Sequence, residues 1–297
     1  MRFGGRRSSD NVEFREGGGS RFGLGGGGGG GGAAMLFGMV FSRFGIGGVV
    51  VLAIVFAIFG GLGSLTGGGQ QAVGPPGGQQ SSARNCRTEP TITFACQTLA
   101  STEEQWAALF TAAGRSYERP RMVIFEGQDN SACGAADARM GPFYCPADRS
   151  IYLDIAFFRE LAQRFAAPGD FAQAYVIAHE VGHHVQTLTG TSDRIRQAQS
   201  AVGEGEVNAL QVRMELQADC YAGVWASREQ SAMEPGDLEE GMTAAAAIGD
   251  DTLQRAGQGR VVPESFTHGS AAQRQEALMR GYRGGTLQAC AGYTNGV

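Results

Sequence analysis

Residues 175–186 constrain the fold more than any other stretch, because they combine an apolar helical pattern with clustered histidines. They contain His179-Glu180-Val181-Gly182-His183, an H-E-x-x-H pattern. Residues four apart lie on one face of a helix, so both imidazoles can bind one metal ion while Glu180 lies beside it. Two neutral imidazoles and a neighbouring carboxylate base are typical of zinc sites that activate water.

Two observations favour a metal site over a chance match, which a short motif of this kind often produces. The residues around the motif are largely apolar, whereas a solvated helix face would carry charges. Histidine is also scarce: the chain has four, and three of them fall at positions 179, 183 and 184.

Two other sets of metal ligands are possible besides this pair. Glu180-x-x-His183 also matches the Glu-x-x-His element of di-iron helix bundles, which need a second such element. The remaining histidine is His268, and residue 265 is Ser rather than Glu, so the di-iron interpretation fails. Glu180 and His184, also four apart, stay open as a less favoured pair of ligands.

A catalytic zinc ion has three protein ligands and one open position for water, so a third ligand is needed. Glu215 and Asp219 lie four apart in a mostly apolar stretch, where paired carboxylates require partners. We predict that Glu215 binds the ion and that Asp219 accepts a hydrogen bond from a ligand histidine. The alternative is an ordinary exposed acidic pair.

Composition divides the chain into four parts. Residues 1–34 are rich in Arg, Gly and Ser and are predicted to form a disordered tail. Residues 35–63 are predicted to hold a transmembrane helix, because residues 44–63 carry no charge over a length that crosses a bilayer. Residues 64–84 are predicted to be a flexible linker, and residues 85–297 the folded body.

The charge distribution predicts on which side of the membrane the body lies. Residues 1–43 carry six Arg against three acidic residues, and such an excess marks the cytoplasmic side. We therefore expect a single-pass protein of the inner membrane with a cytoplasmic N-terminus and an extracytoplasmic body. Because that body is acidic, nucleic acid is not an expected partner, whereas the uncharged stretch makes the lipid bilayer one.

The cysteines point to disulfides. Six are present without a C-x-x-C pattern, which argues against a zinc ribbon or a thioredoxin-type motif. An even number in an extracytoplasmic body suggests pairing. Proximity in the sequence favours Cys86–Cys96 and Cys133–Cys145, which leaves Cys220 with Cys290. Six buried free thiols are the alternative.

The predicted strands come early and the predicted helices late, which indicates an α+β body. Strands are expected over 122–125 and over Ser150–Asp154, the latter as a sheet edge that pairs with an extended peptide. Ser101–Glu104 is a capping box predicted to open a helix. The metal-binding helix is predicted over 170–188 and the helix of Glu215 over 206–228.

The combination of motifs resembles a known family. H-E-x-x-H followed by a Glu-x-x-x-Asp helix is similar to the gluzincin peptidases. With residues 6–13, Glu215–Cys220, Gly249–Asp251 and Phe266–Ser270, the chain resembles the putative neutral zinc metallopeptidase family of bacterial membrane proteins. The resemblance covers nearly all of the chain outside the glycine tract. It implies a mostly helical zincin fold with a small sheet, and hydrolysis of peptide bonds in a peptide or protein substrate.

We therefore predict one zinc ion held by His179, His183 and Glu215. Glu180 is predicted to take a proton from the zinc-bound water and to pass it to the leaving amine. His268 resembles the late histidine of gluzincins that hydrogen-bonds the oxyanion, although it could instead be a loop residue that caps a helix.

Two further features of the C-terminal part bear on the site. Thr267–Arg274 is similar to the His…Arg stretch of membrane-associated gluzincins. Asp250 and Asp251 could hold a second ion or mark the end of a helix, and we favour the helix end.

Two other functions stay open at this point. The first is a non-catalytic, membrane-tethered module with a structural zinc ion, which needs four ligands and could take Cys220 as the fourth. A carboxylate in the position of Glu180 argues against it, since a structural site has no use for a base. The second is a metal-free adaptor, which leaves the clustered histidines unexplained.

Overall fold

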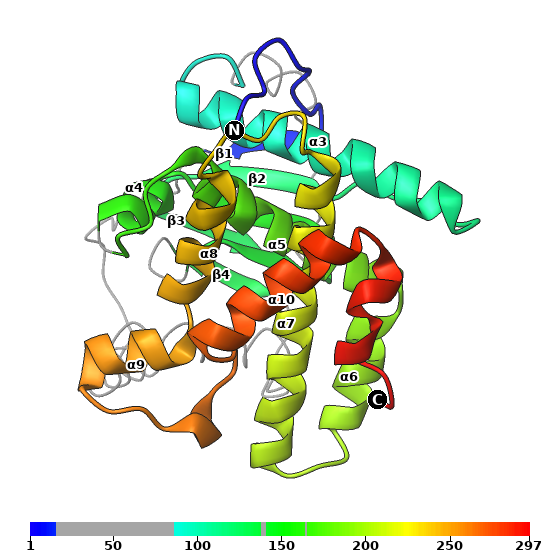
Figure 1. Cartoon of the computed structure of the whole chain (residues 1–297), viewed down its shortest axis with the longest axis vertical. Coiled ribbons are helices and arrows are strands. Elements are labelled where there is room, and N and C mark those ends of the chain that lie inside the picture. Colours follow the sequence, from blue (N-terminus) through cyan, green and yellow to red (C-terminus); the bar gives the residue numbers. More distant parts are fainter. Residues whose placement is uncertain (16–85, 138–140, 164) are drawn as a thin grey trace, which may run out of the picture.

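The computed structural model describes residues 1–15, 86–137, 141–163 and 165–297 (Figure 1). Within them a small sheet packs against a larger set of helices, which confirms the α+β prediction. The predicted transmembrane helix over 35–63 and the predicted linker over 64–84 lie outside the described residues. In the part of the chain that the structure describes, no helix combines the length and apolar character needed to span a membrane.

The main sheet has the strand order β1-β2-β6-β5. Its strands are β1 (Val12–Arg15), β2 (Arg121–Phe125), β6 (Ser150–Asp154) and β5 (Phe143–Cys145). The first three run parallel, and β5 runs antiparallel to β6. A separate hairpin consists of β3 (Gln128–Ser131) and β4 (Gly134–Asp137).

The prediction that Ser150–Asp154 forms a sheet edge is wrong. β6 lies between β2 and β5 and all of its residues are buried, so the edge on this side belongs to β5. The reason is local: β5 consists of Phe143, Tyr144 and Cys145 alone, which is too short to show a strand pattern in the sequence.

The N-terminal residues belong to the folded body, so the predicted disordered tail over 1–34 is wrong for residues 1–15. β1 pairs with β2 along its whole length. Two buried carboxylates from distant parts of the chain bind arginines that precede β1: Arg6 contacts Glu229, directly after α7, and Arg7 contacts Glu103 of α3. Because these partners lie far along the chain, the local composition resembles that of a solvated tail.

This pairing constrains the membrane topology. β1 precedes the uncharged stretch 44–63 and β2 follows it, yet the two strands are hydrogen-bonded neighbours. A chain that crosses a bilayer once has its two flanks on opposite sides, which would separate these strands. The sheet therefore joins the two sequence flanks of the stretch 44–63 in one folded body.

The described residues form the following helices, of which α5 carries the H-E-x-x-H pattern. They are α3 (Pro90–Ala112), α4 (Ala156–Gln163), α5 (Asp170–Leu188), α6 (Thr191–Gln199), α7 (Glu204–Arg228), α8 (Asp237–Ala247), α9 (Asp250–Gln258) and α10 (Ala271–Gly284), with 3-10 turns η2 (Pro263–Ser265) and η3 (Leu287–Tyr293).

α3 begins at Pro90 and not at the predicted capping box. Proline is well suited to the first turn of a helix, since it has no N–H that needs a partner there. The Ser101 hydroxyl lies inside the helix, where it donates to Glu229 and accepts from the Trp225 indole. Ser101 therefore joins α3 to α7 instead of opening a helix.

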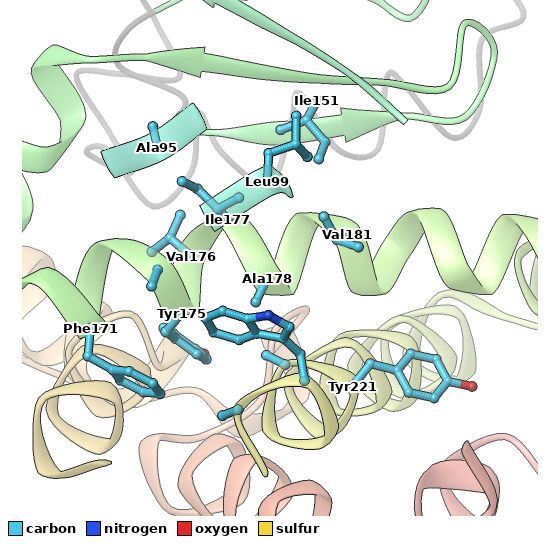
Figure 2. Close-up of a cluster of buried hydrophobic side chains, with 14 of the residues drawn as sticks. Ala95, Leu99, Ile151, Phe171, Tyr175, Val176, Ile177, Ala178, Val181 and Tyr221 are labelled. Atoms are coloured by element: carbon cyan, nitrogen blue, oxygen red, sulfur yellow. The ribbon is translucent and has the colours of Figure 1, made fainter. Parts of the chain in front are cut away.

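Helix α5 is buried on two sides. Figure 2 shows Leu99 of α3 and Ile151 of β6 on the same side of α5 as Ile177, whereas Tyr175 and Phe171 lie toward the helices on the other side. An apolar helix between a sheet and other helices explains why the residues that flank the motif carry few charges.

Helices α7 and α10 cross in close contact (Figure 1). A Cβ atom at Gly281 of α10 would lie 1.8 Å from the backbone oxygen of Cys220, and one at Gly223 of α7 would lie 2.0 Å from that of Leu278. Both positions therefore need glycine. This close packing brings the first turn of α10 against the helix that carries Glu215 and Asp219.

The predicted disulfides are confirmed. The three bonds are Cys86–Cys96, Cys133–Cys145 and Cys220–Cys290, and they account for all six cysteines of the chain. Because Cys220 is oxidised and fully buried, it does not offer a thiolate to a metal ion. The fourth ligand considered for a structural zinc site is thereby removed.

Candidate metal centre

The predicted zinc ligands come together in the structure. His179 and His183 lie one turn apart on α5, and Glu215 lies on the adjacent α7. Glu215 Oε2 is 3.2 Å from His179 Nε2 and 3.4 Å from His183 Nε2. Ligand atoms bound to one zinc ion at about 2.0–2.1 Å in tetrahedral geometry lie roughly 3.3 Å apart. The spacing of these three atoms therefore fits one zinc ion.

The histidine rings are held in the orientation that metal binding requires. His179 Nδ1 is 2.7 Å from Asp219 Oδ1, and His183 Nδ1 is 2.9 Å from Gln186 Oε1. An oxygen partner at Nδ1 places the proton there and leaves the Nε2 lone pair for the metal. Both Nε2 atoms face Glu215, so the donor chemistry fits zinc as well as the spacing does.

Metal binding at this site should release protons. Burial lowers the pKa of His179, but the Asp219 and Glu215 carboxylates outweigh it and raise that pKa to about 10. A ligand histidine has to be neutral at Nε2. Zinc must therefore compete with a proton that the two carboxylates stabilise, which makes the affinity fall as the pH falls.

Glu180 lies beside the ligand atoms without belonging to the group that can share one ion. Its side chain is buried, and burial raises the pKa of the carboxyl against the opposing effect of His179 and His183. The backbone amide of Tyr144 on β5 faces this carboxylate. A buried carboxylate with a raised pKa next to a metal site has the properties of a general base.

Asp219 lies at the centre of a buried hydrogen-bond network behind His179. Its Oδ1 accepts from the Tyr175 hydroxyl at 2.6 Å and from Arg274 Nη2 at 2.9 Å, and its Oδ2 accepts from Arg274 Nε at 2.8 Å. Burial would raise the pKa of Asp219, but Arg274 and then His179 lower it to about 2. Asp219 is therefore a carboxylate that can hold the His179 proton at Nδ1.

His268 lies in the loop between η2 and α10, and this loop packs on α7 through Gly269, where a Cβ atom would lie 3.3 Å from Leu216 Cδ2. Burial raises the pKa of Glu215, whereas His183, His179 and His268 together lower it to well below its ordinary value. Nδ1 of His268 is 3.1 Å from Thr267 Oγ1 and 3.3 Å from Asp250 Oδ1. The structure thus brings His268 to the edge of the candidate site, and its role stays a prediction.

His184 is turned away from the metal ligands. Its Nε2 donates to the backbone oxygen of Glu118 at 2.6 Å, and its Nδ1 accepts from the Tyr144 hydroxyl at 3.0 Å. Burial lowers the pKa of His184 to about 4. Since both ring nitrogens have partners, the geometry does not favour the alternative pair of Glu180 and His184.

The prediction that Asp250 and Asp251 end a helix is wrong, because they are the first two residues of α9. Their oxygens accept backbone amides from residues 267–271.

A second acidic group consists of Asp170, Asp237 and Glu240. The amino group of Met1 is a positively charged partner of this group, 2.6 Å from Asp170 and 3.1 Å from Asp237.

The sequence analysis assigns no role to two polar residues of the site, Gln186 and Gln211, and it names a third, Arg274, only through the family resemblance. Gln186 holds His183, Gln211 donates to Glu215 Oε1 at 2.9 Å, and Arg274 holds Asp219. The spacing of His183 to Gln186 and of Gln211 to Glu215, three and four residues, is a helical signal that could have identified two of them.

Comparisons with known proteins agree with this site. Residues 1–293 match the family described as Putative neutral zinc metallopeptidase. The chain is 44% identical over 298 residues to Uncharacterized protein YpfJ of Escherichia coli K12, with 98% of each chain covered. It is 47% identical over 188 residues to Uncharacterized protein Rv2575 of Mycobacterium tuberculosis H37Rv, covering 59% of this chain and 62% of that protein.

No solved structure matches the chain. The family match spans both the N-terminal residues that form β1 and the helices that carry His179, His183 and Glu215. The chain belongs to the Putative neutral zinc metallopeptidase family.

Proposed function

We propose that this protein is a zinc-dependent peptidase that hydrolyses peptide bonds with a metal-activated water molecule. The observation that carries the proposal is the convergence of His179, His183 and Glu215, with both Nδ1 atoms held by oxygen partners. A bound zinc ion in such a site supplies Lewis acidity and lowers the pKa of its water. The three ligands belong to two helices that pack against each other, α5 and α7.

Each residue around the ligands has a role in this proposal. Glu180 takes a proton from the attacking water and gives it to the leaving amine, a task suited to a carboxyl with a raised pKa. His268 donates to the negatively charged oxygen that forms on the carbonyl carbon. Asp219 fixes the proton of His179 at Nδ1.

The position of β5 at the edge of the sheet supports the proposal that the substrate is a polypeptide. In the described part of the chain β6 is the one strand that pairs with β5, so the other edge of β5 is open to an added strand. β5 also contacts α5, and the amide of Tyr144 faces Glu180. An extended peptide paired with β5 would run past the base, with main-chain hydrogen bonds for affinity.

A membrane location is part of the proposal, with a revised topology. The uncharged stretch 44–63 supports attachment to a bilayer. The three disulfides support a non-cytoplasmic body. Because β1 pairs with β2, residues 1–15 should lie on the same side as the body.

The variant Glu180→Gln tests the peptidase in the full chain. Gln has nearly the size of Glu, and Glu180 is outside the ligand group, so fold and zinc content should persist. Cleavage of unfolded casein should fall by about 10²–10⁴-fold, the usual contribution of general acid–base catalysis. Glu206→Gln, at an exposed position of α7, is the matched control. Unchanged proteolysis with zinc bound would remove the catalytic role of Glu180 and the proposal with it.

A further inference from the structure

The two histidines of the metal site differ in the group that holds Nδ1. His179 faces the Asp219 carboxylate, and a carboxylate accepts through either of its oxygens. His183 faces Oε1 of Gln186 at 2.9 Å, and an amide has one accepting end and one donating end. If the Gln186 amide were reversed, its NH2 group would face Nδ1, and a neutral ring would carry its proton on Nε2, the nitrogen that zinc needs. Metal binding by His183 therefore depends on the direction of the Gln186 amide.

Two backbone carbonyl groups fix this direction. Gln186 Nε2 donates to the backbone oxygen of Met214 at 2.7 Å and to Oε1 of Gln217 at 3.1 Å. Gln217 Nε2 in turn donates to the backbone oxygen of Cys290 at 3.2 Å and to the Thr294 hydroxyl at 2.8 Å. Reversal of either amide would place its oxygen against a backbone oxygen, which has no proton to donate. The direction of both amides therefore follows from the carbonyl groups of Met214 and Cys290.

These hydrogen bonds join the metal site to the C-terminal segment, defined as residues 287–294, which comprises η3 and its last flanking residue. The side chains of Gln186 and Gln217 lie in residues that are 0% and 1% exposed, so solvent does not compete for their hydrogen bonds. The Cys220–Cys290 disulfide ties the segment to α7 one helical turn after Gln217. The bond thus holds the carbonyl group of Cys290 beside the amide that it orients.

We propose that Gln186 and Gln217 are positioning residues for the metal, and that the C-terminal segment belongs to the metal site because it fixes the direction of these amides. The proposal rests on the proposed function for the presence of zinc at His183. Arg213 is the matched control. It also joins α7 to this segment, through the backbone oxygens of Tyr293 at 2.6 Å and of Asn295 at 2.8 Å, but it hydrogen-bonds neither amide.

The test measures the zinc affinity of the folded full chain by competition with a chelator. The variants are Gln186→Met, Gln217→Met and Arg213→Met, in which Met has nearly the size of Gln and carries no amide. We expect the affinity to fall by about 10–100-fold in Gln186→Met, as for other residues that orient a metal ligand. It should fall by roughly 2- to 10-fold in Gln217→Met, the equivalent of one hydrogen bond. Arg213→Met should stay close to wild type.

Gln186→Glu separates the orientation of His183 from packing. A carboxyl group in place of the amide can present an accepting oxygen to Nδ1 in either direction. Gln186→Glu should therefore keep the zinc that Gln186→Met loses. In the Gln186→Glu background, Gln217→Met should lower the affinity no further, because there is no amide direction left to fix. Urea unfolding of each metal-free variant identifies the conditions in which it is folded.

Three outcomes would overturn the proposal: wild-type zinc affinity in Gln186→Met, an equal loss in Gln217→Met and Arg213→Met, or a loss in Gln186→Glu as large as in Gln186→Met. The first would remove Gln186 from the metal site, and the other two would indicate a general packing effect. A wild-type protein that binds zinc but cleaves no peptide would contradict the proposed function alone, because these affinities do not depend on proteolysis. A wild-type protein that binds no zinc would overturn both.

Discussion

The Asp219 carboxylate and the Arg274 guanidinium form a bidentate ion pair inside the protein, with nitrogen–oxygen distances of 2.8 and 2.9 Å. Both side chains are almost completely buried. The same carboxylate accepts from His179 Nδ1, so Asp219 connects Arg274 to a predicted zinc ligand. Arg274 thereby keeps Asp219 charged and in place where an apolar environment would otherwise favour the neutral acid.

Replacement of Arg274 should therefore destabilise the fold strongly. In Arg274→Met, Asp219 loses its bidentate counter-charge and keeps only His179 as a cationic partner, and the loss of one partner of a buried ion pair costs about 3–5 kcal/mol. Urea unfolding of the metal-free protein measures this. Arg283→Met, on the exposed face of the same helix, is the control. A stability equal to that of the control would show that Asp219 does not depend on Arg274.

The zinc content of ligand variants tests the metal site directly. His183→Ala and Glu215→Ala each remove one of three ligands, so both should lose most of the approximately one zinc ion per chain that the wild type is expected to hold. His184→Gln should keep it, because His184 is adjacent to a ligand but bonded elsewhere. Elemental analysis of the purified full chain decides this. Full zinc in His183→Ala and Glu215→Ala would exclude these residues as ligands.

The parts of the site that could be predicted are those with a spacing pattern inside a single helix, which are the motif on α5 and the pair Glu215 and Asp219 on α7. His179, Glu180 and His183 lie within one turn of α5, so spacing alone defines their geometry. Asp219 and Arg274 are 55 residues apart, and they meet because α7 and α10 pack through glycines. That contact depends on the tertiary fold and has no local pattern.

The same distinction holds for the sheet. The five-residue β2 and β6 are apolar enough to be recognised, whereas β1 carries Glu13 and Arg15 and lies in an Arg-rich segment. It pairs with β2, and the arginines before it, Arg6 and Arg7, bind Glu229 and Glu103 from parts of the chain far away in sequence. Composition describes the segment correctly and cannot show its partners.

His184 should make the folding stability depend on pH. Its pKa is about 4 in the folded protein, because burial disfavours the charged ring, against an ordinary value of 6.5. Between these values the unfolded chain binds more protons than the folded one, so stability is complete above pH 6.5 and falls as the pH falls toward 4. At 1.36 kcal/mol per pKa unit, the loss is roughly 3 kcal/mol.

The test compares urea unfolding of the wild type and His184→Gln at pH 7 and pH 4.5. Both proteins should be metal-free, since zinc binding has its own pH dependence. Gln can still donate to Glu118 and accept from Tyr144, so it replaces the titrating ring without leaving these groups unpaired. The wild type should lose clearly more stability than the variant on acidification. Equal losses would show that His184 does not titrate in this range.

The topology can be decided with two cysteine reporters. Gly4 and Gly203 are suitable positions, because an added Cβ meets no atom within 4 Å at either. Gly4 lies before β1 and Gly203 before α7, on opposite sides of the uncharged stretch 44–63 in the sequence. The native cysteines are all paired, so the unsubstituted chain should not react with maleimide.

We expect Gly4→Cys and Gly203→Cys to react with a membrane-impermeant maleimide from the same side of the membrane, the non-cytoplasmic one. The reason is energetic as well as geometric. If residues 1–15 left the body, β2 would lose one of its two partner strands, and Glu103 and Glu229, each 1% exposed, would lose Arg7 and Arg6. A buried carboxylate without its cation is strongly destabilising. Labelling of the two positions from opposite sides would mean that β1 and β2 do not pair in the membrane-bound protein, and the single-pass topology would return.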